Sequence, residues 1–263
     1  MHQSTHIRRT VLVVVAALAV LIAAIVEDLI EDRSGAPAFT LNDADPQFPT
    51  LPVGAELPSD KECAERVSAA GLEREVRPEN TAPNNSTPGG LTLPAWPSFW
   101  AQQVNEEYVP RINGQFTGST NEIIAWGSCK WGIDANVVRA MAVSETFWRQ
   151  SFVGDLVDDP ALCLGDYEVP CPTSFGLLQL KYTTRPGSWP GSRDHTAFNV
   201  DYSLAVLRGC FEGYITYLDS SYAAGDLWGC AGWHYSGEWY NDAARQYIDL
   251  TQWHYRYREW LRW

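Results

Sequence analysis

The sequence predicts a mainly α-helical domain with disulfide-stapled loops, preceded by an N-terminal membrane segment and an extended arm. Apolar residues recur at helical spacing through most of the second half of the chain, whereas alternating patterns typical of strands are sparse. The six cysteines are even in number and follow an apolar N-terminus typical of exported proteins. We expect helices over residues 98–108, 119–130, 134–146, 199–219 and 240–262.

Residues 1–33 are interpreted as a signal anchor or a signal peptide. Arg8 and Arg9 precede an apolar run over residues 11–26, and carboxylates follow it. The run is long for the hydrophobic part of a signal peptide and short for a transmembrane helix. The positive charge before it and the negative charge after it favour an uncleaved anchor over a cleaved peptide. Either way, we expect the body of the protein outside the cytoplasm, anchored to the membrane or secreted.

Residues 34–95 are expected to form an extended linker or arm, because they are rich in Pro, Gly, Asn and carboxylates and show little periodicity. One short helix is predicted over residues 59–67, with Ser59 as its N-cap and Glu62 completing a capping box. Cys63 lies in this helix and could tie the arm to the folded domain, which we place at residues 96–263.

The cysteines are expected to form three disulfide bonds, since the nearest histidines are not at zinc-ligand spacing and the N-terminus indicates export. The favoured pairing is Cys63–Cys129, Cys163–Cys171 and Cys210–Cys230, because the last two pairs close short loops. Other pairings and buried free thiols are the alternatives. The sequence contains no glycine-rich phosphate loop, and we expect no metal and no cofactor.

The composition disfavours nucleic-acid binding. The formal net charge is −13, and contact with phosphates needs a basic patch. The same charge would repel an anionic wall polymer at long range, so glycan binding would depend on short-range contacts. Twelve Trp and twelve Tyr could provide these by stacking on sugars, although most aromatic side chains are expected in the core. Trp228, Trp233 and Trp239 are candidate sugar platforms.

Glu145 is the most informative single residue. It falls in the last turn of the helix predicted to begin after Asp134, a candidate N-cap, and it follows the apolar stripe that contains Met141. A carboxyl held there against Phe147 and Trp148 would be partly desolvated. Desolvation disfavours the charged form and raises the pKa, which suits a general acid near neutral pH.

The segment Glu145-Thr146-Phe147-Trp148, followed by Gly176-Leu177-Leu178-Gln179, resembles the Glu-Ser-x-Phe and Gly-Leu-Met-Gln signature of the soluble lytic transglycosylases. Goose-type lysozymes are relatives of that family. Asn199 precedes a helical pattern as in the family, and residues 233–237 lie where the family carries Ala-Tyr-Asn-Ala-Gly. The resemblance covers roughly residues 96 to 263 and implies a lysozyme-like fold.

The resemblance implies an enzyme that cuts the β-1,4 bond between N-acetylmuramic acid and N-acetylglucosamine in peptidoglycan. Glu145 would act as the single acid/base and give a 1,6-anhydro product. Thr146, Gly176 and Gln179 would bind the substrate; Gly176 would let the backbone approach the sugar, or is a plain turn residue. The expected partners are glycan strands, and the protein is expected to be a monomer.

The block at residues 233–237 departs from the family. His234 or Tyr235 takes the place of the family tyrosine that orients the acid and the sugar, and the alignment is ambiguous. A lysozyme-type hydrolase, with a base drawn from Asp155, Asp158, Asp159 or Asp166, is therefore an alternative. A hydrolase of a related polymer such as chitin and an inactive glycan-binding scaffold are two others. Asn199 is expected to cap the helix that follows it.

Overall fold

The computed structural model describes residues 45–263, which form one unit whose regular structure is mostly helical. The predicted mainly α class is confirmed. The predicted N-terminal membrane segment lies outside the described residues. Within residues 45–263, none of the helices combines the length and the apolar character needed to cross a membrane.

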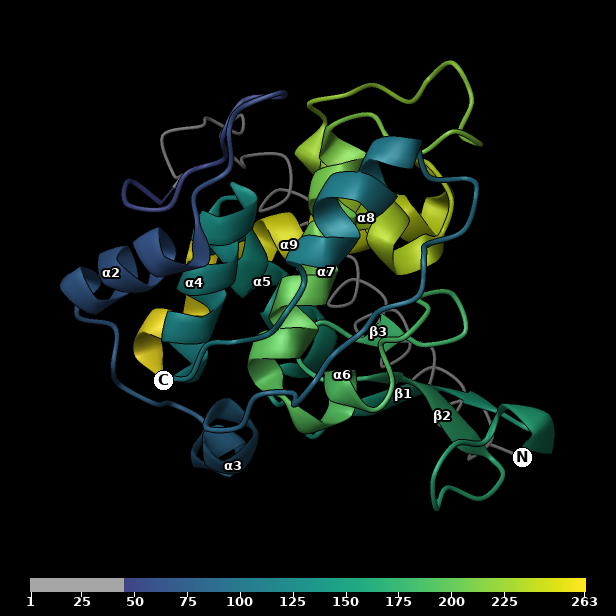
Figure 1. Cartoon of the computed structure of the whole chain (residues 1–263), viewed down its shortest axis with the longest axis horizontal. Coiled ribbons are helices and arrows are strands. Elements are labelled where there is room, and N and C mark those ends of the chain that lie inside the picture. The colour runs from purple at the N-terminus through teal and green to yellow at the C-terminus, as the bar shows by residue number, and fades with distance from the viewer. Residues whose placement is uncertain (1–44) are drawn as a thin grey trace, which may run out of the picture. The chain divides into compact units, whose positions relative to one another are not determined.

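Eight α-helices and a small antiparallel sheet make up the regular structure of residues 45–263 (Figure 1). The helices are α2 (Asp60–Ala70), α3 (Thr81–Asn84), α4 (Thr120–Trp131), α5 (Ala135–Thr146), α6 (Gly191–Asp194), α7 (Thr196–Phe211), α8 (Leu227–Ser236) and α9 (Asp242–Tyr257). The strands, in sheet order, are β1 (Val153–Val157), β2 (Cys171–Phe175) and β3 (Leu180–Lys181).

Side-chain caps explain where several predicted helices begin. The Asp134 carboxylate accepts the N–H groups of Asn136 and Val137 at the start of α5. Ser119 and Glu122 form a reciprocal capping box at the start of α4. Ser59 accepts the N–H of Glu62 at the start of α2, as expected.

Three helix predictions were wrong in their extent. The pattern over 240–262 is interrupted, because α9 ends at Tyr257 and Arg258 adopts a left-handed backbone before a 3-10 turn over Glu259–Arg262. The pattern over 98–108 forms only a short π turn, Val104–Tyr108, followed by a 3-10 turn, because Pro110 cannot continue a helical hydrogen-bond ladder. The pattern over 199–219 begins earlier and stops at Phe211, since Gly213 adopts a left-handed backbone with φ +87°.

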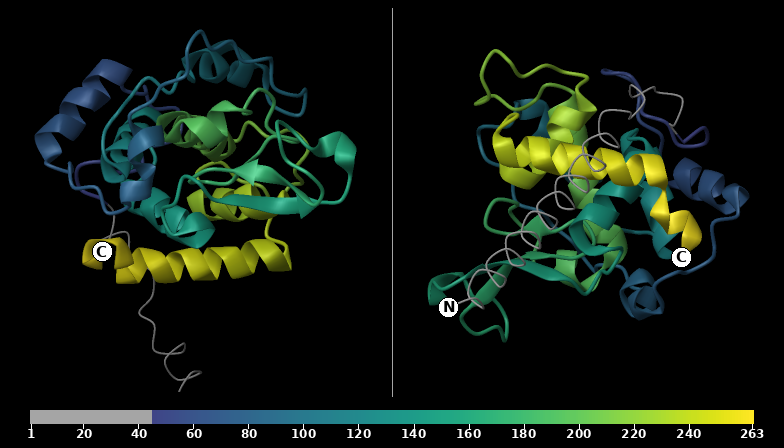
Figure 2. Two further views of the ribbon diagram at one scale, coloured as in Figure 1. Left: turned by 90° about the horizontal axis from the view of Figure 1, so that it is seen from below. Right: turned by 180° about the vertical axis from the view of Figure 1, so that it is seen from behind.

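Helices α4 and α7 cross in the core, where nearly every residue of α7 is buried. Gly127 makes the close approach possible: a side chain there would overlap Val200 of α7. Helix α9 lies across α5 and α8 and packs on both, and Figure 2 shows it running along one side of the unit.

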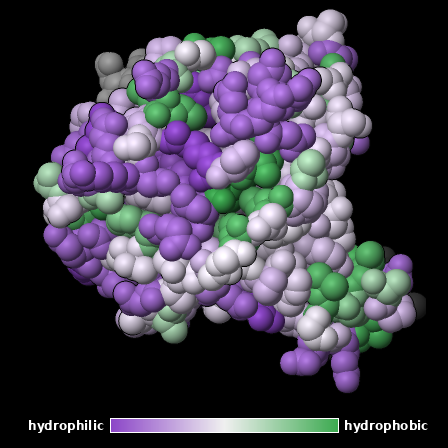
Figure 3. Space-filling view, viewed as in Figure 1, coloured by the Kyte–Doolittle hydropathy of each residue, from purple (hydrophilic) through white to green (hydrophobic). Residues whose placement is uncertain are grey.

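Residues 151–173, for which the sequence predicts no helix, contain a β-hairpin of β1 and β2 with a 3-10 turn, Pro160–Leu162, between the strands. Strand β2 is buried throughout, so it lacks the alternation that identifies a half-exposed strand in a sequence. Hydrophobic side chains gather over the outer end of this hairpin in Figure 3, where Leu156 and Val169 are exposed.

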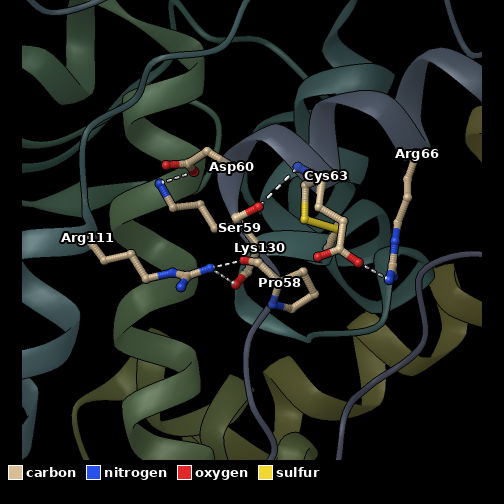
Figure 4. The surroundings of a disulfide bond; sticks show 9 residues. Pro58, Ser59, Asp60, Cys63, Arg66, Arg111 and Lys130 are labelled. Atoms are coloured by element: carbon tan, nitrogen blue, oxygen red, sulfur yellow. Dashed lines mark hydrogen bonds and ion pairs between the residues drawn. A yellow bond between two sulfur atoms is a disulfide. The ribbon is translucent and has the colours of Figure 1, made fainter.

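All three predicted disulfides are confirmed, and none of the cysteines is free. Figure 4 shows Cys63–Cys129 joining α2 to α4. Beside it, Lys130 pairs with Asp60 at 2.7 Å, and Arg111 donates to the carbonyls of Pro58 and Lys130. The bond therefore lies among polar contacts that fix the same junction.

Residues 45–95, most of the expected arm, pack into the same unit as residues 96–263. Phe48 and Asn80 are buried, and Asp45 forms an ion pair with Arg139 at 2.6 Å. Arg208 of α7 donates to the carbonyls of Leu51 and Pro52. This packing uses irregular backbone and single polar contacts, which leave no periodic pattern in a sequence.

Replacing both Cys63 and Cys129 by Ala should lower the free energy of unfolding by about 4 kcal/mol, since the bond closes a loop with a sequence separation of 66. Replacing Cys163 and Cys171 by Ala is the matched control, and its shorter separation of 8 should cost about 2.5 kcal/mol. Guanidinium unfolding of the full-length variants measures both. Equal losses would contradict the loop-length argument.

Candidate active site

A cleft of about 950 Å³ opens between the C-terminal end of α5, the sheet, the segment after β3 and the C-terminal half of α8. Four of the six residues that the sequence singled out line it: Glu145, Gln179, His234 and Tyr235. The other two, Thr146 and Gly176, are not among its lining residues. The cleft thus brings together residues separated by up to ninety positions in the chain.

Glu145 lies in the last turn of α5 and its carboxyl reaches the cleft. Burial by the surrounding protein raises its pKa from 4.5 to about 7. The nearby Tyr247 hydroxyl acts in the opposite direction, and the negative charge of Asp155 raises the pKa further. A substantial share of Glu145 is therefore protonated at neutral pH, as the sequence predicted for a general acid.

Tyr247 of helix α9 lies beside Glu145. Tyr247 is buried there, and its hydroxyl makes no hydrogen bond of normal geometry within the described residues. Its ring stacks on Tyr235 of α8, with centroids 4.6 Å apart and planes 11° apart. Ser144 and Thr251 share a hydrogen bond of 2.9 Å between α5 and α9. These contacts hold α9 against the end of α5 that carries Glu145.

Gly176 begins the tight turn between β2 and β3, with φ +79°. A Cβ atom there would collide with the Ser192 carbonyl and the Asn199 side chain. Gly176 thus allows the turn to pack against α6 and α7. This packing favours the interpretation of Gly176 as a turn residue over its interpretation as a residue that lets the backbone approach a sugar.

Two buried amides hold this turn. Gln150 accepts the N–H of Leu177 at 2.9 Å, and Asn199 accepts the N–H of Leu178 at 2.8 Å. Asn199 also donates to the Phe175 carbonyl at 2.8 Å. Asn199 was predicted as a helix cap, and that prediction was wrong: α7 already begins at Thr196, so the side chain is available for the turn.

Thr146 is buried at the end of α5, and its hydroxyl lies 3.1 Å from the Leu177 carbonyl and 3.2 Å from the Ala142 carbonyl. It therefore links the helix that carries Glu145 to the turn after β2. The structure places it as a positioning residue behind the cleft wall, where it has no access to a bound sugar.

Gln179 lines the cleft with a left-handed backbone, φ +44°. Its amide nitrogen donates to the Gly176 carbonyl at 2.9 Å and to the Phe152 carbonyl at 3.2 Å. Both donors of the amide are therefore directed at the protein, and the side chain closes the turn at the cleft surface.

His234 lines the cleft and lies 3.2 Å from the Leu178 carbonyl through Nε2, so this nitrogen carries the proton. Nδ1 is buried and has no hydrogen-bond partner among residues 45–263. Burial and the charge of Arg185 lower the pKa of His234 to about 4, so the ring is neutral at neutral pH. Tyr235 is 56% exposed and presents its ring at the cleft surface.

Of the four aspartates considered as a second carboxylate, Asp155 is the one that lines the cleft. Its backbone is left-handed, with φ +51°, and its Oδ2 atom contacts the Ser174 hydroxyl at 2.5 Å and the Lys181 ammonium at 3.2 Å. Asp158, Asp159 and Asp166 belong to the outer part of the hairpin and are not among the lining residues.

Of the three tryptophans expected as sugar platforms, one lines the cleft. Trp233 lines the cleft, though it is almost completely buried. Trp228 packs on Tyr255, and Trp239 packs on Tyr222 with ring centroids 4.9 Å apart. Tyr217 and Phe99 also line the cleft.

Sequence reasoning missed Tyr247 and Arg185. Tyr247 lies on the apolar stripe of the last helix, where an aromatic residue predicts core packing and nothing more. Arg185 lies in a polar segment of no recognisable pattern. No local signal identifies either residue. Within residues 45–263, no three His, Cys, Asp or Glu side chains lie close enough together to hold a metal ion.

Two substitutions should move the pKa of Glu145 in opposite directions. Tyr247→Phe removes the hydroxyl that favours the carboxylate, so the pKa should rise above about 7. Asp155→Asn removes a repelling charge, so the pKa should fall. Carbon-detected NMR titration of the Glu145 carboxyl measures both, and shifts of the same sign would contradict the assignment of causes.

Glu145→Gln should stabilise the protein at alkaline pH. Because the folded state holds the Glu145 proton more tightly than the unfolded chain does, the wild type loses stability as the pH rises from about 4.5 to about 7. The variant imitates the protonated form and avoids this loss. Its free energy of unfolding should exceed that of the wild type by up to about 3 kcal/mol at pH 8 and by little at pH 4. Denaturant unfolding at both pH values tests this, and a pH-independent difference would refute it.

Comparison of the chain with protein-family models, with curated proteins and with solved structures found no match. Function is therefore inferred from the cleft itself. The cleft holds a carboxyl with a raised pKa, a second carboxylate that lines the same space, and an aromatic wall.

Proposed function

We propose that this protein is a glycosidase of the lytic transglycosylase type, with a lysozyme-like fold, that cleaves the β-1,4 bond between N-acetylmuramic acid and N-acetylglucosamine. The observation that carries the proposal is Glu145, a carboxyl with a pKa of about 7 in a large cleft. The resemblance of the segments around Glu145 and Gln179 to that family supports it independently.

In the proposed reaction, protonated Glu145 donates its proton to the bridging oxygen as the bond from that oxygen to C1 of the muramic acid breaks. The carbonyl oxygen of the substrate's own N-acetyl group bonds to C1. The 6-hydroxyl then attacks C1 and displaces it, and the hydroxyl proton returns to Glu145. The product is a 1,6-anhydro sugar, and Glu145 regains its starting state.

A lysozyme-type hydrolysis is the second candidate, and Asp155 is the observation that favours it. Asp155 lines the cleft with Glu145 and is close enough for its charge to raise the pKa of Glu145. Its Oδ2 atom is held by Ser174 and Lys181, while Oδ1 has no partner among the described residues. Oδ1 could accept a proton from a water that attacks C1.

The remaining contacts suit a sugar polymer. The exposed ring of Tyr235, backed by the stacked ring of Tyr247, offers a rigid face for a sugar ring. Tyr217 and Phe99 continue the aromatic lining. The three disulfides are consistent with a site of action outside the cytoplasm, where peptidoglycan lies.

Incubation of the full-length protein with purified peptidoglycan should release soluble fragments that end in 1,6-anhydromuramic acid, as measured by mass spectrometry. Glu145→Gln should reduce the release by at least about a thousandfold while the protein still sediments with the polymer, since it keeps the shape of the site and removes the acid. Binding without any release by the wild type would indicate an inactive scaffold.

Asp155→Asn is the matched substitution for the choice between mechanisms. In the transglycosylase route, it should keep the anhydro product and change the rate by less than about tenfold, through the pKa of Glu145. Reducing muramic ends, lost in Asp155→Asn, would instead establish hydrolysis with Asp155 as the base. Cleavage of chitin in preference to peptidoglycan would assign the protein to a related polymer.

A further inference from the structure

Arg185 lies four residues after β3 and lines the cleft, although only 9% of its surface is exposed. Its guanidinium stands over the ring of Trp233, 5.1 Å from the ring centroid. It is also close enough to His234 for its charge to lower the pKa of that ring. Arg185 therefore belongs to the wall of the cleft that α8 forms.

The charge of Arg185 has no carboxylate partner within the described residues. Its one hydrogen bond there is long, 3.4 Å from Nη1 to the Thr184 carbonyl. The other two buried arginines differ: Arg139 pairs with Asp45, and Arg208 pairs with Glu212. Arg185 is thus an exception to the way this fold treats a buried guanidinium.

The two carboxyl groups that line the cleft do not neutralise Arg185. Asp155 is already paired with Lys181 at 3.2 Å, and about half of Glu145 is protonated, and so uncharged, at pH 7. An unpaired buried cation is costly, and stacking on Trp233 recovers only part of the cost. The chain has a net charge of −13, so carboxylates are plentiful, yet none pairs with Arg185 among the described residues. An anionic group of a bound ligand would supply the missing partner.

We propose that Arg185 is a carboxylate-binding subsite of the cleft, so that the substrate is an acidic glycan in preference to a neutral one. The proposal rests on the function proposed above and narrows its substrate class. A planar guanidinium binds a carboxylate through paired hydrogen bonds, and hydrogen bonds to charged groups are the stronger ones. In peptidoglycan, the carboxylate is either the lactyl group of muramic acid without its peptide, or a free carboxylate of the stem peptide.

The test measures binding by calorimetry in the full-length Glu145→Gln background, where no turnover changes the ligand. Three ligands are compared: a neutral N-acetylglucosamine hexamer, a peptide-free peptidoglycan oligomer with lactyl carboxylates, and a peptide-bearing oligomer. Adding Arg185→Gln should weaken binding of a carboxylate-bearing oligomer by about tenfold or more and change binding of the neutral hexamer less than about twofold. Whichever carboxylate-bearing oligomer loses affinity identifies the source of the carboxylate.

Arg193→Gln is the matched control. Arg193 also stands over a tryptophan, Trp189 at 4.5 Å, but it does not line the cleft, so its removal should leave all three affinities unchanged. A second measurement needs no change at Arg185: converting the carboxylates of the oligomers to amides should weaken their binding to the unaltered site by a similar factor.

The outcomes separate the two proposals. If all three ligands bind and neither Arg185→Gln nor amidation changes their relative affinities, the carboxylate subsite is refuted and the glycosidase function stands. If no glycan binds at all, the proposed function fails, and the subsite with it. If Arg185→Gln does not fold, the amidation result alone decides.

Discussion

The cleft depends on a pair of buried amides. Gln150 and Asn199 come from different parts of the chain and accept the successive N–H groups of Leu177 and Leu178. A buried backbone donor without a partner costs about 1–3 kcal/mol, so losing either amide would favour another path for the turn after β2. Asn80, within the expected arm, accepts the N–H of Gln150 and donates to the Trp148 carbonyl. The N-terminal packing, the end of α5 and the cleft wall are therefore one connected structure.

This connection explains how the protein holds a carboxyl in an unfavourable place. Burying Glu145 raises its pKa and so costs stability as the pH rises from about 4.5 to about 7. The surroundings keep the residue there: Thr146 ties the helix end to the turn, and the Ser144–Thr251 bond ties the preceding residue to α9. These two contacts fix the last turn of α5, and with it the backbone that carries Glu145.

The sequence could predict those features whose signal lies within a short stretch of chain. Helix α5, its Asp134 cap and the disulfides were predictable, because periodicity, capping and loop closure act within short stretches of chain. The fully buried β2 strand and the role of Asn199 were not, since both depend on partners that only the fold brings near. The same limit applies to the cleft: Glu145 has a local signature, whereas Tyr247 and Arg185 are recognised only by what they face.

The charges of the cleft resolve an apparent conflict in a protein of net charge −13 that is proposed to bind an acidic polymer. Exposed charges are screened over about 8 Å at physiological ionic strength, so repulsion by the outer surface is weak when the polymer is close. Inside the cleft, Lys181 neutralises Asp155, about half of Glu145 is uncharged at pH 7, and the charge of Arg185 remains. The local charge is therefore positive at the place where the ligand would be desolvated and electrostatic interactions are strongest.

As the pH rises through about 7, Glu145 ionises and cancels this charge, so the proton proposed for catalysis and the attraction for the proposed acidic substrate would be lost over the same pH range.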